Sequence, residues 1–312
     1  MIKTKAIRKI FITTVTMFVL LTVFSIPMLN DEDALRVNFE IKDDKNFDTN
    51  NIYLLSENGY LVKSNVIFDS DNLKDKVLKV LNNLIENENS KYSSNLKGVI
   101  PYKEKILDVF CGNDLVTIDF SKEILSVSEK LEKDMISAIV YSVLDIGDIK
   151  GVSIMIEGKL LSEYPNSKEV LPTVLNKDIG INKEYDINSR DNITSVILYY
   201  LEDIDDSYYY VPVTKYLNDS RDKIKIIVEE LTTSYIYEDN LMSFLNSKLE
   251  LVDYREENDL MILNFNEYLF DSNDNILEEV IYTIGYSVFD NYDVSMVMFE
   301  VNGKEVYNIS RK

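Results

Sequence analysis

The feature that most constrains this 312-residue chain is an internal repeat: the sequence matches itself when it is shifted by 145 residues. The matching segments are 113–115 with 258–260, Phe120 with Phe265, 141–143 with 286–288, and 158–159 with 303–304. One constant shift that links several separated matches is typical of a duplicated domain. The sequence therefore predicts two copies of one domain, each with the same order of elements.

The first copy shows the pattern of that domain most clearly. It predicts, in order, strands at 52–55 and 60–68, a helix at 72–87, strands at 104–110 and 114–120, a helix at 127–146 and a strand at 152–158. Asn58-Gly59 is a hairpin signal between the first two strands. Ser126 with Glu129 predicts a capping box at the second helix, and Gly147 predicts its end.

The second copy repeats the pattern with strands at about 196–201 and 208–214 and a helix at about 219–234. Helices that follow hairpins favour an α+β fold. We therefore predict two tandem β-β-α-β-β-α-β domains, each with two helices on one face of a mixed sheet. The predicted organisation is an anchor or signal peptide at 1–30, a spacer at 31–50, domains at 51–162 and 193–308, and a polar linker or extended strap at 163–192.

The N-terminal thirty residues are basic and then apolar. Four basic residues between positions 3 and 9 precede an uncharged segment at 10–29, and acidic residues follow. About twenty such residues match a bilayer core, and the positive flank places the N-terminus in the cytoplasm. No small-x-small cleavage site stands where a signal peptide needs one. We expect an uncleaved signal anchor, with a cleaved signal peptide as the alternative, and export of the rest.

Composition excludes several classes of chemistry. The chain has no histidine and one cysteine, Cys111. Ser–His and Cys–His nucleophile systems and His-ligated metal sites need residues that it lacks. A net charge of −21, spread along the chain, argues against binding to nucleic acid. We expect no catalytic residue, no cofactor and no metal site.

Two matched strands carry the most informative side chains, Asp119 in "VTIDF" and Asn264 in "MILNF". General acid–base catalysis requires a group that titrates, and asparagine does not. Both side chains keep an oxygen that can accept a backbone N–H where the strand ends. We therefore expect a structural motif, which includes Phe120, Ser121, Tyr141 and Gly158 in the first copy and Phe265, Tyr286 and Gly303 in the second.

Three further segments have a structural explanation as well as a functional one. Tyr208, Tyr209 and Tyr210 are typical of a half-buried sheet face, but tyrosine is also enriched at interface centres. Cys111 is expected to be a small, semi-buried residue at a strand end. "DSNDN" at 271–275 lacks the glycine and glutamate that a calcium loop requires, so we expect it to cap the following helix.

The segments "LVTIDFSKE", "AIVYSVLDIGDIKGVSIMIEGK" and "GVIP" resemble the GerMN domain family. In that family a V-D-F-S-like strand end leads to a helix with a Y-T-L-like turn and a short strand that closes on E-G. The resemblance covers about 52–161 and reaches about 197–306 through the repeat. It implies an exported, membrane-tethered protein of endospore-forming bacteria, similar to ring-building modules of secretion systems and without catalytic residues. Family members are often lipoproteins, and this chain lacks the lipidated cysteine.

The N-terminal segment and the composition predict a non-catalytic, membrane-tethered, extracytoplasmic protein, and the resemblance implies a role in sporulation or spore germination. We expect an assembly or ring-building component of an envelope complex between mother cell and forespore, single-pass in the cell membrane. The expected partners are other envelope proteins, in a homo- or hetero-oligomer, and the membrane through the N-terminal helix, with no nucleic acid. The alternative is an exported peptidoglycan-binding protein or a carboxylate-dependent hydrolase of the cell wall.

Overall fold

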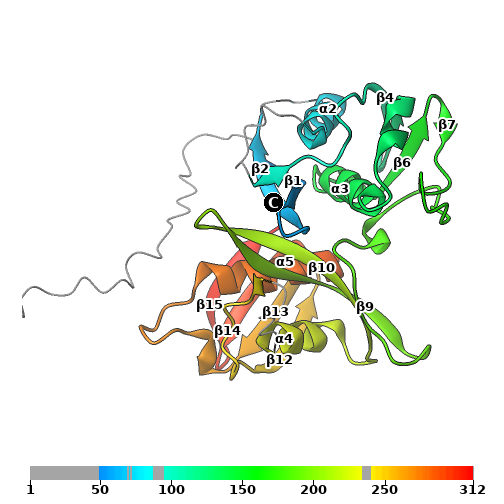
Figure 1. The fold of residues 1–312 in the computed structure, drawn as a ribbon. Coiled ribbons are helices and arrows are strands. Elements are labelled where there is room, and N and C mark those ends of the chain that lie inside the picture. Colours follow the sequence, from blue (N-terminus) through cyan, green and yellow to red (C-terminus); the bar gives the residue numbers. More distant parts are fainter. Residues whose placement is uncertain (1–48, 69, 71, 87–94, 234–239, 312) are drawn as a thin grey trace, which may run out of the picture. The chain divides into compact units, whose positions relative to one another are not determined.

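The computed structural model describes residues 49–68, 70, 72–86, 95–233 and 240–311. All of them belong to one compact unit (Figure 1). The predicted anchor at 1–30 and nearly all of the predicted spacer at 31–50 lie outside the described residues. Within those residues, no helix is both long and apolar enough to cross a membrane.

The first copy has the predicted order of elements, with short additions. Its elements are β1 (Thr49–Ser56), β2 (Leu61–Ile67), α2 (Leu73–Leu84), β3 (Leu96–Lys97), β4 (Ile106–Cys111), β5 (Leu115–Phe120), the 3₁₀ helix η2 (Lys122–Ser126), α3 (Glu132–Leu144), β6 (Gly151–Ile156) and β7 (Lys159–Leu160). The Asn72 side chain caps α2 by accepting the N–H of Lys74 at 2.9 Å. The buried residues of α2 recur at helical spacing, so this helix buries one face.

The second copy follows the same plan with a longer hairpin. Its elements are β9 (Ile193–Ile204), β10 (Ser207–Asn218), α4 (Lys223–Thr233), β11 (Leu241–Met242), β12 (Leu251–Glu257), β13 (Leu260–Phe265), the 3₁₀ helix η4 (Glu267–Leu269), α5 (Glu278–Asn291), β14 (Met296–Val301) and β15 (Lys304–Ser310). The β9–β10 hairpin turns at Asp205 and Asp206, whose φ values are 53° and 60°. Two successive positive φ values are the geometry of a type I′ turn, which matches the twist of the strands.

The prediction of one mixed sheet for each copy, with both helices on one face, is wrong. Among the described residues the two hairpins form one seven-stranded sheet in the order β11-β9-β10-β2-β1-β3, with β8 (Glu184–Asp186) beside β10. β2 meets β10 where Lys63 pairs with Tyr210. The remaining strands form two mixed four-stranded sheets, β4-β5-β6-β7 and β12-β13-β14-β15. Each copy thus gives its hairpin to a sheet that both copies share.

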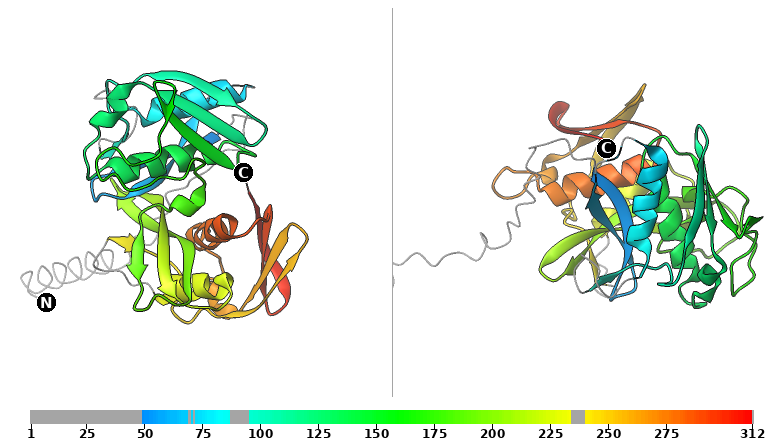
Figure 2. Two further views of the ribbon diagram at one scale, coloured as in Figure 1. Left: turned by 90° about the vertical axis from the view of Figure 1, so that its right-hand side faces the viewer. Right: turned by 90° about the horizontal axis from the view of Figure 1, so that it is seen from above.

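Burial on all sides of the second helices explains this arrangement. Every residue of α3 from Met135 to Leu144 is buried, and most of α5 is buried too. A helix that is apolar all round must be covered on two sides. Figure 2 shows α5 between the strands of the shared sheet and the β12–β15 sheet. A single sheet would leave one face of each helix in water.

Three local predictions also need correction. Ser126 ends η2, and α3 begins only at Glu132, so the predicted capping box does not form. In "DSNDN" the Asp271 carboxylate accepts the N–H groups of Asn273 and Asn275 at 2.8 Å. This segment is a turn of its own and not the cap of α5. Cys111 is exposed and not semi-buried, because β4 is an edge strand of its sheet.

The segment 163–192 is a packed strap between the copies. Ile181 is fully buried, and Leu171 and Leu175 are nearly so. The Asn182 side chain accepts the N–H of Leu61 at 2.9 Å and donates to the carbonyls of Leu61 and Pro212 at 2.8 Å each. This one side chain therefore joins β2 of the first copy to β10 of the second.

We predict that Asn182→Ala lowers the free energy of unfolding by about 2–4 kcal/mol, because three partly buried hydrogen bonds are lost. Urea unfolding followed by circular dichroism measures this loss. Asn192→Ala is the matched control, since Asn192 is exposed and has a similar left-handed backbone with φ of 52°. It should cost only the backbone term of about 1 kcal/mol. Equal losses for the two variants would contradict the role of Asn182.

Candidate functional site

The two copies meet at a buried polar cluster that repeats the internal symmetry. The Tyr53 hydroxyl donates to Asp145 Oδ2 at 2.8 Å, and the Tyr199 hydroxyl donates to Asp290 Oδ2 at 2.7 Å. The two tyrosine oxygens lie 3.3 Å apart. Asp145 and Asp290 occupy matching positions at the ends of α3 and α5. The matched pairs therefore face each other across the boundary between the copies.

Two serines fix the tyrosines in the same way on both sides. Ser142 Oγ accepts the backbone N–H of Tyr53 at 3.0 Å, and Ser287 Oγ accepts that of Tyr199 at 2.9 Å. Both serines are fully buried. These bonds tie β1 to α3 and β9 to α5, and so hold each hairpin against the helix of its own copy.

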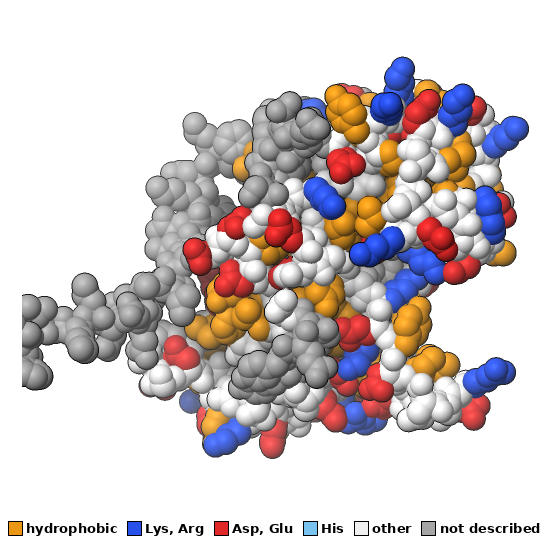
Figure 3. All heavy atoms as spheres, viewed as in Figure 1, with side chains coloured by type: hydrophobic (Ala, Val, Ile, Leu, Met, Phe, Trp, Pro, Cys, Tyr) orange, Lys and Arg blue, Asp and Glu red, His pale blue; other side chains and the backbone are white. Residues whose placement is uncertain are grey.

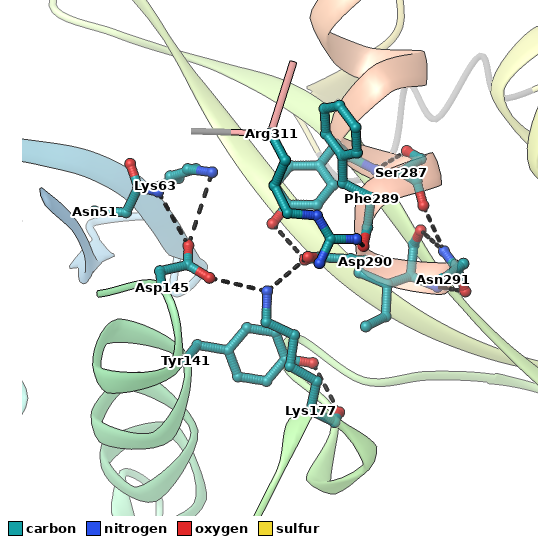
Figure 4. Close-up of polar contacts among 12 residues, drawn as sticks. Asn51, Lys63, Tyr141, Asp145, Lys177, Ser287, Phe289, Asp290, Asn291 and Arg311 are labelled. Atoms are coloured by element: carbon teal, nitrogen blue, oxygen red, sulfur yellow. Dashed lines mark hydrogen bonds and ion pairs between the residues drawn. The ribbon is translucent and has the colours of Figure 1, made fainter. Parts of the chain in front are cut away.

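The strap supplies the cation that the two carboxylates share. Lys177, in the 3₁₀ helix η3 (Lys177–Ile179), places its Nζ 2.9 Å from Asp145 Oδ1 and 2.6 Å from Asp290 Oδ1. Figure 4 shows the ammonium between the two acids. Two matching residues and one unmatched residue thus form a single ion network.

A second lysine approaches the cluster from β2. Lys63 Nζ lies 3.8 Å from Asp145 Oδ2 and 4.1 Å from the centre of the Tyr286 ring. Lys177 Nζ lies in turn 5.5 Å from the centre of the matching Tyr141 ring. A cation near an aromatic face is stabilised by the ring quadrupole. The predicted motif residues Tyr141 and Tyr286 therefore belong to this cluster.

Burial and charge together set the pKa values in the cluster. Burial alone would raise the pKa of Asp145, but Lys177 and Lys63 outweigh it and hold that pKa below its usual range. Burial alone would lower the pKa of Lys177, but the two aspartates raise it above its usual range. Burial lowers the pKa of Lys63, and the aspartates offset this only in part. The charged forms of Asp145 and Lys177 are thus the stable ones.

The buried cluster joins the two domains through an ion network, and we call this network the lock. Its members are Tyr53, Asp145, Lys177, Tyr199 and Asp290. The Asp145 and Asp290 side chains are each 10% exposed and bind groups of the protein itself. Removing one member of such a buried network leaves a charge without its partner, which is strongly destabilising. The acids and the lysines therefore hold the copies together in one arrangement.

The predicted strand-end residues lie apart from the lock, in matching positions. The Asp119 carboxylate accepts the N–H of Gly158 at 3.0 and 3.1 Å. Asn264 Oδ1 accepts the N–H of Gly303 at 3.0 Å. Gly158 and Gly303 have φ values of 77° and 71°, which favour glycine. Each acceptor therefore stabilises the tight turn after β6 or β14.

The other predicted residues are distributed through the structure. Phe120 and Phe265 are fully buried core residues. Ser121 Oγ donates to the buried carboxylate of Glu104 at 3.1 Å, and burial raises the pKa of Glu104.

The tyrosine cluster on β10 is half buried. Tyr208 packs edge-to-face on Phe244, and Tyr210 packs on Tyr282 and Tyr286 of α5.

Asp145, Asp290 and Lys177 are not among the site residues predicted from the sequence. The two acids do match at the shift of 145 residues, each followed by a polar turn, so the repeat contained a signal for them. Lys177 lies in the strap, where no repeat exists, and only the fold brings it to the acids. Across the residues that the structure describes, no group of three or more Cys, Asp or Glu side chains could hold a metal ion.

The fold and the lock define a class: a tandem protein in which two copies of one α+β domain form a single unit. The chain belongs to the family described as "Germane: Sporulation and spore germination", whose sequence profile matches residues 51–162 and 197–307. It is 27% identical over 263 residues to the spore germination protein GerM of Bacillus subtilis, a match that covers 81% of this chain and 71% of that protein.

A solved structure agrees with the fold. The tandem GerMN domains of the sporulation protein GerM from Bacillus subtilis match with a TM-score of 0.77 and 23% identity. The match covers 85% of this chain and 96% of that structure. The GerMN resemblance predicted from the sequence is confirmed, and homology places the chain among sporulation and germination proteins.

We predict that Lys177→Met lowers the free energy of unfolding at pH 7 by about 3–5 kcal/mol, because two buried carboxylates lose their shared cation. Urea unfolding measures this loss. Lys74→Met is the matched control, because the ion pair of Lys74 with Asp108 at 2.6 Å is exposed and should contribute less than about 1 kcal/mol. The triple variant Asp145→Asn, Lys177→Met, Asp290→Asn should recover part of the loss.

The pH dependence of stability between pH 5 and 7 should distinguish Lys177→Met from the unaltered protein. In the unaltered protein the lowered pKa of Asp145 contributes stability above the unfolded value of about 3.9, which is lost as pH falls through the folded pKa. The raised pKa of Lys177 contributes stability below about 10.4, which is lost at higher pH. Between pH 5 and 7 both contributions are constant. Lys177→Met should instead gain stability as pH falls to 5, because a proton taken up by the two carboxylates relieves the repulsion between Asp145 and Asp290. The absence of such a gain would contradict the role of Lys177 as their shared cation.

We predict that Asp119→Asn changes the free energy of unfolding by less than about 0.5 kcal/mol, because Asn264 performs the same task in the second copy. Asp119→Ala should cost about 1 kcal/mol, since the N–H of Gly158 loses its acceptor. Thermal unfolding compares the two variants. A large loss for Asp119→Asn would show that the negative charge matters and would contradict the structural reading.

Proposed function

We propose that the chain is a membrane-tethered, extracytoplasmic component of an envelope complex of sporulation or spore germination, and that it acts in assembly and not in catalysis. The complex would lie between mother cell and forespore, with the N-terminal segment as a single-pass anchor. The family membership and the similarity to GerM support the sporulation context. The basic and then apolar N-terminus supports the anchor.

The observation that carries the proposal is the internal lock. Lys177 joins Asp145 to Asp290, so a buried charge network holds the two copies in one orientation. An assembly component needs fixed surfaces at fixed angles, and a rigid pair of domains supplies them. Asp119, the sequence's candidate acid, is bound to a backbone N–H and has a neutral counterpart in Asn264. Both observations favour a scaffold over an enzyme.

The proposed partners are other envelope proteins and further copies of the chain. The outer four-stranded sheets would provide the contact surfaces, because the hairpins are already paired with each other in the shared sheet. Peptidoglycan, the alternative partner class expected from the sequence, would require a surface that recognises sugars and peptide stems.

The proposal predicts that deleting the gene in its native endospore former lowers the yield of heat-resistant spores. The full chain supplied in trans should restore the yield, and so should the Asp119→Asn variant. A form without residues 1–30 should fail, because it would stay in the cytoplasm. In vivo crosslinking of the full chain should recover envelope proteins or copies of the chain. Normal engulfment and normal spore yield after deletion would contradict the proposal.

A further inference from the structure

A pair of tyrosines lies on the surface where the strap joins the shared sheet. Tyr185 of β8 and Tyr216 of β10 are in register, and their rings stack with centroids 5.0 Å apart and planes 10° apart. Tyr185 is 64% exposed, although it is a large aromatic residue. Stacking on Tyr216 thus fixes the plane of a ring that is largely exposed to solvent.

One lysine adjoins the tyrosine pair, and a second lies near another tyrosine, Tyr164. The half-buried Lys183 places its Cε 2.9 Å, and Tyr216 places its hydroxyl 3.1 Å, from the point that a Cβ on Gly180 would occupy. Lys183 is therefore a neighbour of Tyr216. Lys133 Nζ lies 2.7 Å from Glu169 and 5.8 Å from the centre of the Tyr164 ring. Figure 3 shows basic and hydrophobic side chains side by side at the indentation on the right of the molecule.

A cavity of about 400 Å³ lies beside the N-terminal half of α3. Its lining includes Ser56, Glu57, Lys97, Lys130, Leu131 and Asp134. Asp134 lies one helical turn before Ser137, whose hydroxyl donates to the Gly180 carbonyl at 2.9 Å, so this wall of the cavity lies next to the strap that carries Lys183. The volume lies in the range of ligand sites. The cavity thus offers both acidic and basic groups to a ligand that carries both charges.

We propose that this surface, defined by Tyr185, Tyr216, Lys183 and the cavity around Asp134, binds peptidoglycan. Sugar rings present a flat C–H face that stacks on an exposed aromatic ring, so a sugar of the glycan strand would lie on Tyr185. The peptide stems carry free carboxylates, which Lys183 and Lys130 would bind, and free amines, which Asp134 and Glu57 would bind. The inference rests on the export that the proposed function assumes.

The charge pattern argues for this ligand over other polymers. A polyanion such as nucleic acid would meet Asp134 and Glu57 in a chain of net charge −21. An apolar peptide would leave Lys97, Lys130 and Asp134 without partners in the cavity. A neutral glycan would use the tyrosines but not the charges. A polymer that combines sugar rings with zwitterionic stems matches both the tyrosine pair and the charges of the cavity.

The test is co-sedimentation of the full chain, in mild detergent micelles, with purified peptidoglycan sacculi. Tyr185→Ala should weaken binding by about tenfold, which corresponds to about 1.4 kcal/mol, and Lys183→Met should weaken it as well. Tyr102→Ala is the matched control, because Tyr102 is 68% exposed and lies outside the proposed surface. This variant should bind like the unaltered chain. Urea unfolding verifies that all three variants stay folded.

Co-sedimentation with chitin, a neutral glycan without peptide stems, distinguishes sugar stacking on Tyr185 from binding of stem carboxylates by Lys183. Tyr185→Ala should weaken binding to chitin, whereas Lys183→Met should leave it unchanged. The inference is overturned if the unaltered chain does not co-sediment with sacculi, or if Tyr185→Ala binds as well as Tyr102→Ala. Protease protection in spheroplasts tests export separately. A chain that is accessible outside the membrane but does not bind sacculi would refute this inference and leave the proposed function standing.

Discussion

The ammonium of Lys177 between Asp145 and Asp290 is the interaction on which the rest of the structure depends. Two carboxylates at matching positions, each 10% exposed, would repel each other where the copies meet. The strap brings one cation to both, and the tyrosine hydroxyls of Tyr53 and Tyr199 complete the coordination. Asp145 and Asp290 are equivalent positions of the repeat, and Lys177 of the strap supplies the positive charge that allows the two carboxylates to lie close together.

This dependence explains why the copies share a sheet. The hairpins pair through β2 and β10, and Asn182 of the strap binds both strands. The ion network, the β2–β10 pairing and the hydrogen bonds of Asn182 therefore all lie at the boundary between the copies. Each of these contacts opposes a rotation of one copy relative to the other. A protein built this way presents its two outer sheets at a fixed angle. That property is what the assembly role proposed for the chain requires.

The sequence predicts the elements well because hairpin signals, helical spacing and the repeat are local patterns. The match of Asp119 with Asn264 identified a shared acceptor, and both side chains bind a glycine N–H. The shared sheet could not be predicted, because pairing between β2 and β10 depends on how two complete domains meet. Lys177 was missed for the same reason, since it lies in a segment without a repeat. Cys111 is exposed because it lies on an edge strand, which a local sequence pattern does not reveal. α3 begins later than predicted because the 3₁₀ helix η2 and a turn precede it.

The buried ion network should make the two copies behave as one cooperative unit. Native-state hydrogen exchange measured by mass spectrometry tests it most directly, because peptides from α3 and α5 report the opening free energy of each copy separately. We expect both helices to open with the same free energy, in one global event. Opening free energies that differ by more than about 2 kcal/mol, with one helix exchanging while the other stays protected, would contradict it.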